Sequence, residues 1–478
     1  MGTSARLRPT YALVFFLLVL LFVLLGLLHI DRSCLDAADS TYLISADGIS
    51  RGLMPYRDFL LAHPPLLFLL GAPLAALKAG VLPFRIFSIL VAAGVGLAVW
   101  RLALRLTANQ SLALLAAALA LFAPLGVFFS KLFLNDSLVS LLAAGMVLLL
   151  LSGSRRSTAA AGVLAVLGML TKLTFVPVLV VAVVYLLIYR RGRLRLFLAV
   201  ALGGTVLTAL ALEALTGGAY LGDILGAQAS KGYSFTNFYE GLHRIWQMDW
   251  PLLVPAVPGL YFMGREWRRA RGEPRGRLFL VLGWLAAGVT LLATLPAEGH
   301  DTNLFQVAEP AVALLAAWGI TGLAASNRFL AVAAAAWVVV AASFVAVKDR
   351  SFLARSNAEF VQGVVAHIED ATPGGEAILA PGCYALEADR PVVYNFFDRF
   401  LWEEKYKRAD PGAVNLYNGM WVELAVQGIP AVVLEEDTPT FVLLRDHLDS
   451  YYTKTASSPS QPPVALWLPN KTAPQPCG

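Results

Sequence analysis

Long apolar segments recur through the first 350 residues and restrict this chain to very few folds. A segment in lipid must satisfy its backbone hydrogen bonds internally, and a single helix needs about 20 apolar residues to cross. The first run, "YALVFFLLVLLFVLLGLLHI", lacks a small-residue cleavage site, so we predict a retained span rather than a signal peptide. Eleven spans are predicted, near residues 11–30, 85–105, 110–129, 136–153, 157–171, 173–189, 196–215, 249–263, 278–296, 310–325 and 329–347. With only 14% charged residues, against about 25% in soluble domains, the chain is predicted to be a polytopic α-helical membrane protein.

The placement of arginine predicts the orientation of these spans. With the N-terminus in the cytoplasm, the inside connections contain "RRGRLR" (190–195) and "GREWRRARGEPRGR" (264–277), as the positive-inside rule requires. The run "PPLLFLLGAPLAAL" (64–77) is too short to cross and would reverse every later loop, so we predict a juxtamembrane helix at the interface. The basic clusters are interpreted as topology determinants, and no nucleic-acid partner is predicted.

The composition changes after about residue 347, which divides the chain into two predicted domains. Residues 1–347 would form the transmembrane domain, with a first outer loop and its juxtamembrane helices at 31–84. Residues 348–478 contain β-like runs at 376–381, 391–396 and 431–436, with a helical pattern at 415–428. We predict a small extracytoplasmic α/β domain with a loop-like tail from 455, and of the three cysteines at most two can pair within the chain.

Polar residues of four separate segments are predicted to face the extracytoplasmic side. The first loop, "DAADSTYLISADGISRGLMPYRDFLLAHPPL" (36–66), is the most polar of them. The others are "FFSKLFLNDSL" (128–138), "MLTKLTFVP" (169–177) and "AEGHDTNLFQVAEP" (297–310). Their candidate site residues are Asp36, Asp39, Tyr42, Asp58, His63, Lys131, Asp136, Lys172, His300 and Asn303. Such a set could hold a lipid-linked anion, with the cationic groups at its phosphate and a carboxylate as the base.

The first loop resembles that of the GT-C glycosyltransferases, in particular the protein O-mannosyltransferase-like family 39 and the related lipid A aminoarabinose transferases. The resemblance rests on an acidic residue before a tyrosine, then "G..PYRDF", then "HPPL" leading into a juxtamembrane helix. "LNDSL", "LTKLTFVP" and the late segment 299–319 extend it more weakly to roughly residues 10–345.

The resemblance implies a function and a base. Family members transfer sugars from polyprenyl-phosphate donors outside the cytoplasm, usually with inversion, and several work without metal. Their early acidic residue corresponds to Asp39. The usual Asp-Glu pair is replaced here by Ala38 and Asp39, and Asp36 lies close by, so the base is either Asp39, the first choice, or Asp36. We therefore predict a glycosyltransferase with no resident cofactor or metal, although a divalent ion is compatible with this donor chemistry, and the acceptor is left open as protein, lipid or glycan.

Several candidate residues also have a purely structural interpretation. Asp39 and Asp136 would suit helix N-termini. Asp58 would pair with Arg57, and Lys172 would extend to the headgroups.

Two other function classes compete with the transferase. A transporter or flippase of an amphiphilic anion would place polar residues at mid-membrane and show a two-fold repeat, which the sequence does not display. An inactive relative that serves as a binding or assembly module is the third alternative, because the second acid of the family pattern is missing.

Overall fold

The computed structural model describes residues 8–28, 30, 37–229, 232–297, 300–326, 358–372, 375–392, 432–435, 452–458 and 464–469, with single residues between 329 and 344. Its contacts divide the chain into two units. The first combines residues 1–30, 86–210 and 232–354, and the second combines 31–85, 211–231 and 355–478. The first loop is thus grouped with the C-terminal part of the chain rather than with the transmembrane helices.

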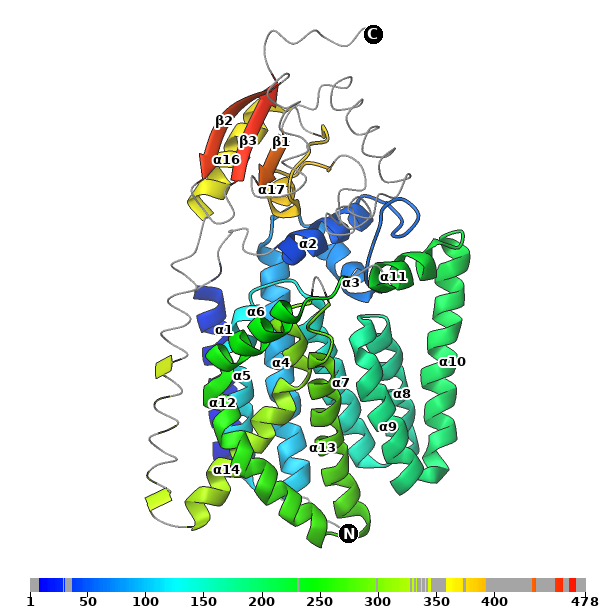
Figure 1. Cartoon of the computed structure of the whole chain (residues 1–478), viewed down its shortest axis with the longest axis vertical. Helices are drawn as coiled ribbons and strands as arrows, with labels where there is room; N and C mark the ends of the chain where they lie inside the picture. The colour runs from blue at the N-terminus through cyan, green and yellow to red at the C-terminus, as the bar shows by residue number, and fades with distance from the viewer. Residues whose placement is uncertain are drawn as a thin grey trace. The chain divides into compact units, whose positions relative to one another are not determined.

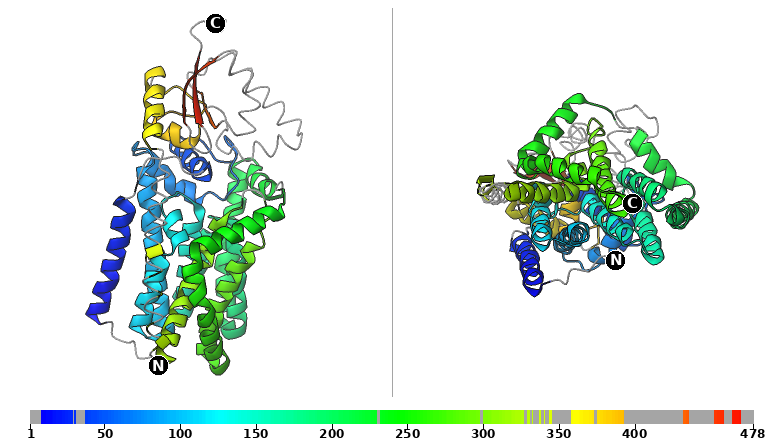
Figure 2. Two further views of the ribbon diagram at one scale, coloured as in Figure 1. Left: turned by 60° about the vertical axis from the view of Figure 1, so that its left-hand side comes forward. Right: turned by 90° about the horizontal axis from the view of Figure 1, so that it is seen from below.

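The first unit is a helical bundle whose long members run side by side (Figure 1), and their circular cross-sections are seen in the end-on view (Figure 2). Its elements are α1 (Pro9–Leu28), α4 (Leu82–Thr107), α5 (Gln110–Leu121), α6 (Pro124–Phe129), α7 (Asn135–Ser152), α8 (Arg155–Met169), η1 (Leu173–Phe175), α9 (Val176–Tyr189), α10 (Arg191–Leu215), α12 (Phe235–Arg269), α13 (Gly272–Leu292), η2 (Thr302–Val307) and α14 (Glu309–Ser326). The first four residues of α4 and the last five of α10 belong to the second unit.

Within the described residues, six helices are long and apolar enough to cross a membrane: α1, α4, α7, α10, α13 and α14. The prediction of a polytopic membrane protein is therefore confirmed. Ten of the eleven predicted spans coincide with helices, and the eleventh, 329–347, lies mostly outside the described residues. The span predicted at 110–129 is instead two helices, because Pro124 starts α6 after a break at Ala123.

Helix α12 is longer than its predicted span at 249–263 and contains three internal prolines. It packs against α14 at close backbone approach. A Cβ on Gly259 would collide with the backbone oxygen of Leu315, and one on Gly319 with that of Pro255. These two glycines allow α12 and the middle of α14 to pack at backbone contact.

The second unit contains the first loop and the C-terminal segments. Its elements are α2 (Ala37–Ser50), α3 (Leu66–Ala75), α11 (Ala219–Ala229), α16 (Ala358–Ala371), α17 (Gly382–Glu387), β1 (Val432–Glu435), β2 (Tyr452–Ser458) and β3 (Val464–Pro469). The ten-residue α3 agrees with the interfacial helix expected at 64–77. Helix α2 is buried along most of its length, and Cys383 in α17 is disulfide-bonded.

The strands form an antiparallel sheet in the order β1-β3-β2, with α16 beside it (Figure 1). Val432 pairs with Trp467 and also forms a parallel bridge with Leu379, which lies in the run 376–381 expected as a strand. Residues 455–458, expected as loop, form the end of β2, because pairing with β3 supplies hydrogen bonds that local composition does not reveal. The helix expected at 415–428 lies outside the described residues.

Candidate active site

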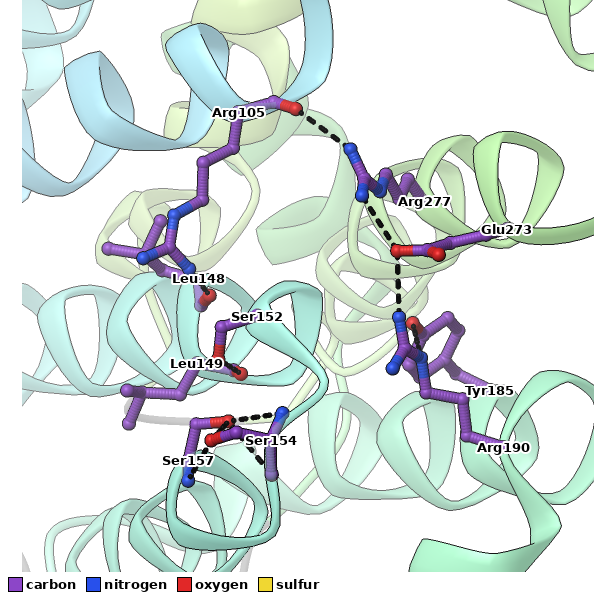
Figure 3. Close-up of polar contacts among 10 residues, drawn as sticks. All are labelled: Arg105, Leu148, Leu149, Ser152, Ser154, Ser157, Tyr185, Arg190, Glu273 and Arg277. Carbon is purple, nitrogen blue, oxygen red and sulfur yellow. Dashed lines mark hydrogen bonds and ion pairs between the residues drawn. The ribbon is translucent and has the colours of Figure 1, made fainter. Parts of the chain in front are cut away.

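Polar residues gather at both ends of α7, and the two ends differ in chemistry. At its C-terminal end, Arg105 Nη1 donates to the backbone oxygen of Leu148 at 2.7 Å (Figure 3). Arg277 Nη1 donates to the backbone oxygen of Arg105, and Arg190 and Arg277 both bond to Glu273, at 2.9 and 2.7 Å. These arginines come from connections predicted to be cytoplasmic, and the bundle brings them to one end.

The opposite end of α7 carries Asp136, and the 18 residues of this helix place it about 27 Å away. Lys172 Nζ donates to both carboxylate oxygens of Asp136 at 2.9 Å, and Asn303 Nδ2 donates to Oδ2 at 2.8 Å. Asp136 is completely buried and Lys172 is 7% exposed. Three residues from three predicted outer segments thus meet in one cluster.

Local backbone structure positions each of these three side chains. Asp136 lies in the first turn of α7, where the positive helix end favours a carboxylate. The backbone of Lys172 is extended directly before η1, so its side chain does not lie on a helix surface. Asn303 lies in η2, whose start is capped by the Asp301 carboxylate accepting from the Thr302 N–H.

The cluster fixes what Lys172 can do. Two of its three ammonium N–H groups are directed at Asp136, which leaves one for a further acceptor. The Asp136 carboxylate also compensates the positive charge of Lys172. Lys172 can therefore donate a hydrogen bond to an anionic ligand, but it adds little net positive charge. Lys172 therefore does not extend to the lipid headgroups, and Asp136 is not a surface residue.

Unfilled hydrogen-bonding capacity lies beside this cluster. Ser137 Oγ donates to Gln306 Oε1 at 3.1 Å, and Ser140 Oγ bonds to the backbone oxygen of Gln306 at 2.7 Å. The Gln306 Nε2 atom and both polar atoms of the Asn135 side chain are buried without a hydrogen-bond partner. Ser137, Ser140, Gln306 and Glu309 line a small, partly open cavity of about 30 Å³. Buried amides without partners indicate that a water or a ligand group can bind here.

Glu309 forms the far wall of this cavity and connects three helices. Its Oε1 accepts the Gly126 N–H at 3.0 Å, and the Leu125 N–H donates to Asp249 Oδ1 at 3.0 Å. The Asp249 and Glu309 carboxyl groups thus accept from neighbouring N–H groups at the start of α6. The pair attaches α12 and α14 to the start of α6.

The two remaining candidates of the first unit lie in its connecting segments. His300 bonds through Nδ1 to the backbone oxygen of Thr294 at 2.8 Å, which orients its ring on the turn after α13. Lys131 is buried in the connection between α6 and α7.

The second unit places Asp39 in a buried ion pair. Arg85 Nη2 lies 2.8 Å from Asp39 Oδ2, and both side chains are at most 2% exposed. Asp39 is in the first turn of α2 and Arg85 in the first turn of α4. The guanidinium favours the ionised carboxylate and fixes its direction.

Tyr42 lies about one helical turn after Asp39 on α2 and contacts His63, which lies in the loop before α3. The Tyr42 ring makes edge contacts with His63 at 5.5 Å and Phe68 at 5.2 Å between centroids. Tyr56 donates its hydroxyl to the His63 backbone oxygen at 2.8 Å. These contacts fix the position of His63, the residue directly before Pro64 and Pro65.

Asp58 fixes the "MPYRDF" turn. Its carboxylate accepts the Met54 N–H at 2.7 Å and pairs with Arg57 at 2.8 Å. The pairing with Arg57, followed by the Met54 N–H, lowers the pKa of Asp58 to about 2. Tyr56 in the same turn has φ of 69°, a left-handed conformation that non-glycine residues adopt only when their surroundings hold it. These contacts are those expected if Asp58 has the structural role of pairing with Arg57 to fix the turn.

Two of the predictions find no direct counterpart in the structure. Asp36 lies outside the described residues. In the described part of the chain, no three His, Cys, Asp or Glu side chains come together as metal ligands, and the absence of a metal requirement stays a prediction.

The sequence analysis did not single out Arg85, Asn135, Asp249 or Glu309 as site residues. A signal was present for two of them: Arg85 and Asp249 are the first residues of predicted spans, where an ionisable group is costly unless it has a partner.

The described geometry can be compared with known proteins. Residues 62–215 match the family model of dolichyl-phosphate-mannose-protein mannosyltransferases, a stretch that contains His63, Lys131, Asp136 and Lys172 but not Asp39. The crystal structure of ArnT from Cupriavidus metallidurans bound to undecaprenyl phosphate matches at a TM-score of 0.70 and 13% identity, over 98% of this chain and 100% of that one. The fold is similar to that of ArnT. Both comparisons support the resemblance to this group of sugar transferases, although the family model begins at residue 62 and leaves out most of the first loop.

A more distant relative shares the same fold. The archaeal oligosaccharyltransferase AglB from Archaeoglobus fulgidus, in complex with an inhibitory peptide and a dolichol-phosphate, matches at a TM-score of 0.61 and 13% identity, over 97% of this chain and 74% of that one. No curated protein sequence matches the chain. At these identities the structural matches establish the fold alone, and the six long apolar helices of the described residues indicate an integral membrane protein.

Proposed function

We propose that the protein is a membrane glycosyltransferase that moves a sugar from a polyprenyl-phosphate donor to an acceptor. The observation that carries this proposal is the family match over residues 62–215, joined to an ArnT-like fold over nearly the whole of both chains. The ArnT structure contains undecaprenyl phosphate and the AglB structure a dolichol-phosphate, which favours a polyprenyl phosphate as the lipid of this donor.

In the proposed reaction Asp39 is the base. An acceptor O–H or N–H gives its proton to the carboxylate while the acceptor lone pair bonds to the anomeric carbon. The bond between that carbon and the phosphate oxygen breaks, and its electrons stay on the phosphate. Arg85 holds Asp39 ionised and oriented until the acceptor arrives, and Asp36 remains the second choice as base.

The negative charge that develops on the phosphate needs hydrogen-bond donors held in place. Lys172, with its third N–H, is the best-positioned candidate of the first unit, and Lys131 and His300 are the other two. Asn303 acts through Asp136, which it helps to hold. Tyr42, one turn after Asp39, and His63, which its ring contacts, are also proposed to bind substrate.

We place the reaction on the extracytoplasmic face, with the N-terminus in the cytoplasm. The arginine-rich end of the first unit supports this orientation by the positive-inside rule. The disulfide of Cys383 supports an oxidising compartment for the second unit.

The proposal is tested with purified protein in liposomes, supplied with radiolabelled undecaprenyl-phosphate sugars and envelope extracts as acceptors. We expect sugar transfer that falls at least 100-fold in Asp39→Asn and is unchanged in Asp370→Asn, an exposed acid of α16. Full activity in Asp39→Asn together with loss of activity in Asp36→Asn would identify Asp36 as the base. Uptake of label into sealed vesicles without any glycosylated product would refute the transferase in favour of a transporter.

A further inference from the structure

Residues 382–389, here named the clamp segment, pack on the first loop from more than 300 positions away in the sequence. Gly382 begins α17 directly above α2. A Cβ at this position would collide with the backbone oxygen of Ser40 and come within 2.8 Å of the Ile44 Cβ atom. Tyr384 and Cys383 are almost completely buried in the same segment. The contact is therefore a close apolar one, made at the residue next to Asp39.

The other end of the clamp segment bonds to the start of α4. Glu387 Oε1 accepts the Val81 N–H at 2.9 Å, and its carboxylate covers Gly80, which has φ of 63°. Val81 in turn accepts the Arg85 N–H at 3.1 Å, so the two residues are one helical turn apart. A carboxylate at this place satisfies an N–H that the helix itself leaves unpaired and interacts favourably with the helix dipole.

A charged network joins the two contacts. Asp389 accepts from Arg51 Nη2 at 3.0 Å and from Lys78 Nζ at 2.8 Å, and Arg51 also bonds to Asp47 of α2 at 2.7 Å. Burial alone would raise the pKa of Asp389, but the bonds from Lys78 and Arg51 outweigh it and lower the pKa. Because Lys78 is largely exposed and Asp389 partly exposed, each pair contributes little to overall stability. The network can orient the clamp segment, but it contributes little to the stability of the fold.

Two of these contacts lie next to the Asp39–Arg85 ion pair. The clamp segment contacts Ser40, the residue after Asp39, and Val81, one turn before Arg85, so a neighbour of each member of the buried ion pair is held by the same short segment. We propose that Glu387, supported by Asp389, is a positioning residue that sets the geometry of the Asp39–Arg85 pair for proton abstraction. This inference rests on the proposed function, and it gives the C-terminal part of the chain a role in the chemical step.

The test compares Glu387→Ala and Glu387→Gln with Glu376→Ala, a change at an exposed carboxylate of the same region. We expect Glu387→Ala, which removes the acceptor of the Val81 N–H, to lower kcat about 10- to 100-fold with the KM for the lipid donor within two-fold, because a small displacement of a reacting group is costly for the chemical step alone. Glu387→Gln keeps an oxygen acceptor of the same length and should recover part of kcat, and Glu376→Ala should match the wild type. An unchanged kcat in Glu387→Ala, or a loss no larger than its loss of folded protein, would overturn the proposal.

A second measurement is independent of activity. Hydrogen–deuterium exchange of the peptide covering residues 37–50 should be faster in Glu387→Ala than in the wild type, with no change in Glu376→Ala. If the wild type transfers no sugar but α2 still loses protection in Glu387→Ala, the proposed function fails while the clamp contact stands. If α2 keeps full protection in Glu387→Ala, the clamp itself is refuted.

Discussion

Removing Lys172 tests whether the buried Asp136 cluster has the energetics that its geometry indicates. Lys172→Met keeps the length of the side chain but removes both bonds to Asp136 and leaves a fully buried carboxylate with Asn303 as its remaining partner. Breaking one partner of a buried ion pair costs about 3–5 kcal/mol, against about 0–1 kcal/mol for an exposed pair. With side chains 9% and 1% exposed, this pair belongs to the first class.

The double variant Lys172→Met with Asp136→Asn separates pairing from catalysis. Replacing both charges removes the unpaired carboxylate, so we expect it to recover most of the unfolding free energy, with a coupling of at least about 2 kcal/mol in a double-mutant cycle. Unfolding is followed by circular dichroism during denaturant titration in detergent micelles, and sugar transfer is measured on the same samples. If Lys172 serves the phosphate, stability returns and activity does not. Additive losses, or a single-variant loss below about 1 kcal/mol, would refute the reasoning.

Two further predictions concern the first loop and the topology. Because Arg57 lowers the pKa of Asp58 to about 2 from 3.8, the carboxylate stabilises the fold above pH 4, and this contribution is lost as the pH falls from about 4 to about 2. Asp58→Asn should therefore melt below the wild type at pH 6 and together with it near pH 2, and a constant difference across that range would contradict the assignment. A cysteine at position 300, in a variant whose native cysteines are blocked, should react with a membrane-impermeant maleimide added outside intact cells. Labelling that requires permeabilised cells would reverse the proposed orientation.

The apolar pattern was enough to predict the bundle, because span length depends only on the thickness of the bilayer. Helix α7 was expected at 136–153 and is Asn135–Ser152, and α14 was expected at 310–325 and is Glu309–Ser326. The same pattern gave the wrong length for α12. The first half of this helix is polar enough to be taken for a loop, and its internal prolines suggest helix ends that the structure does not have. Its close packing on α14 compensates for the backbone bonds that those prolines remove.

The partners of the site residues could not be predicted from local sequence. Asp39 and Arg85 are 46 positions apart, and Asp136 and Asn303 are 167 apart, so their pairing depends on how the helices pack. Sequence reasoning did predict that Asp136, Lys172 and Asn303 share one face, because topology alone brings alternate loops to the same side. It could not show that Lys172 is already paired, nor that residues near 387 support the first loop.

The most direct test is a cryo-electron microscopy structure of the protein with a polyprenyl phosphate bound. The account predicts phosphate density at the Asp136 end of α7, within hydrogen-bond reach of Lys172, Lys131 or His300. Density among Arg105, Arg190 and Arg277 at the other end of that helix would contradict it.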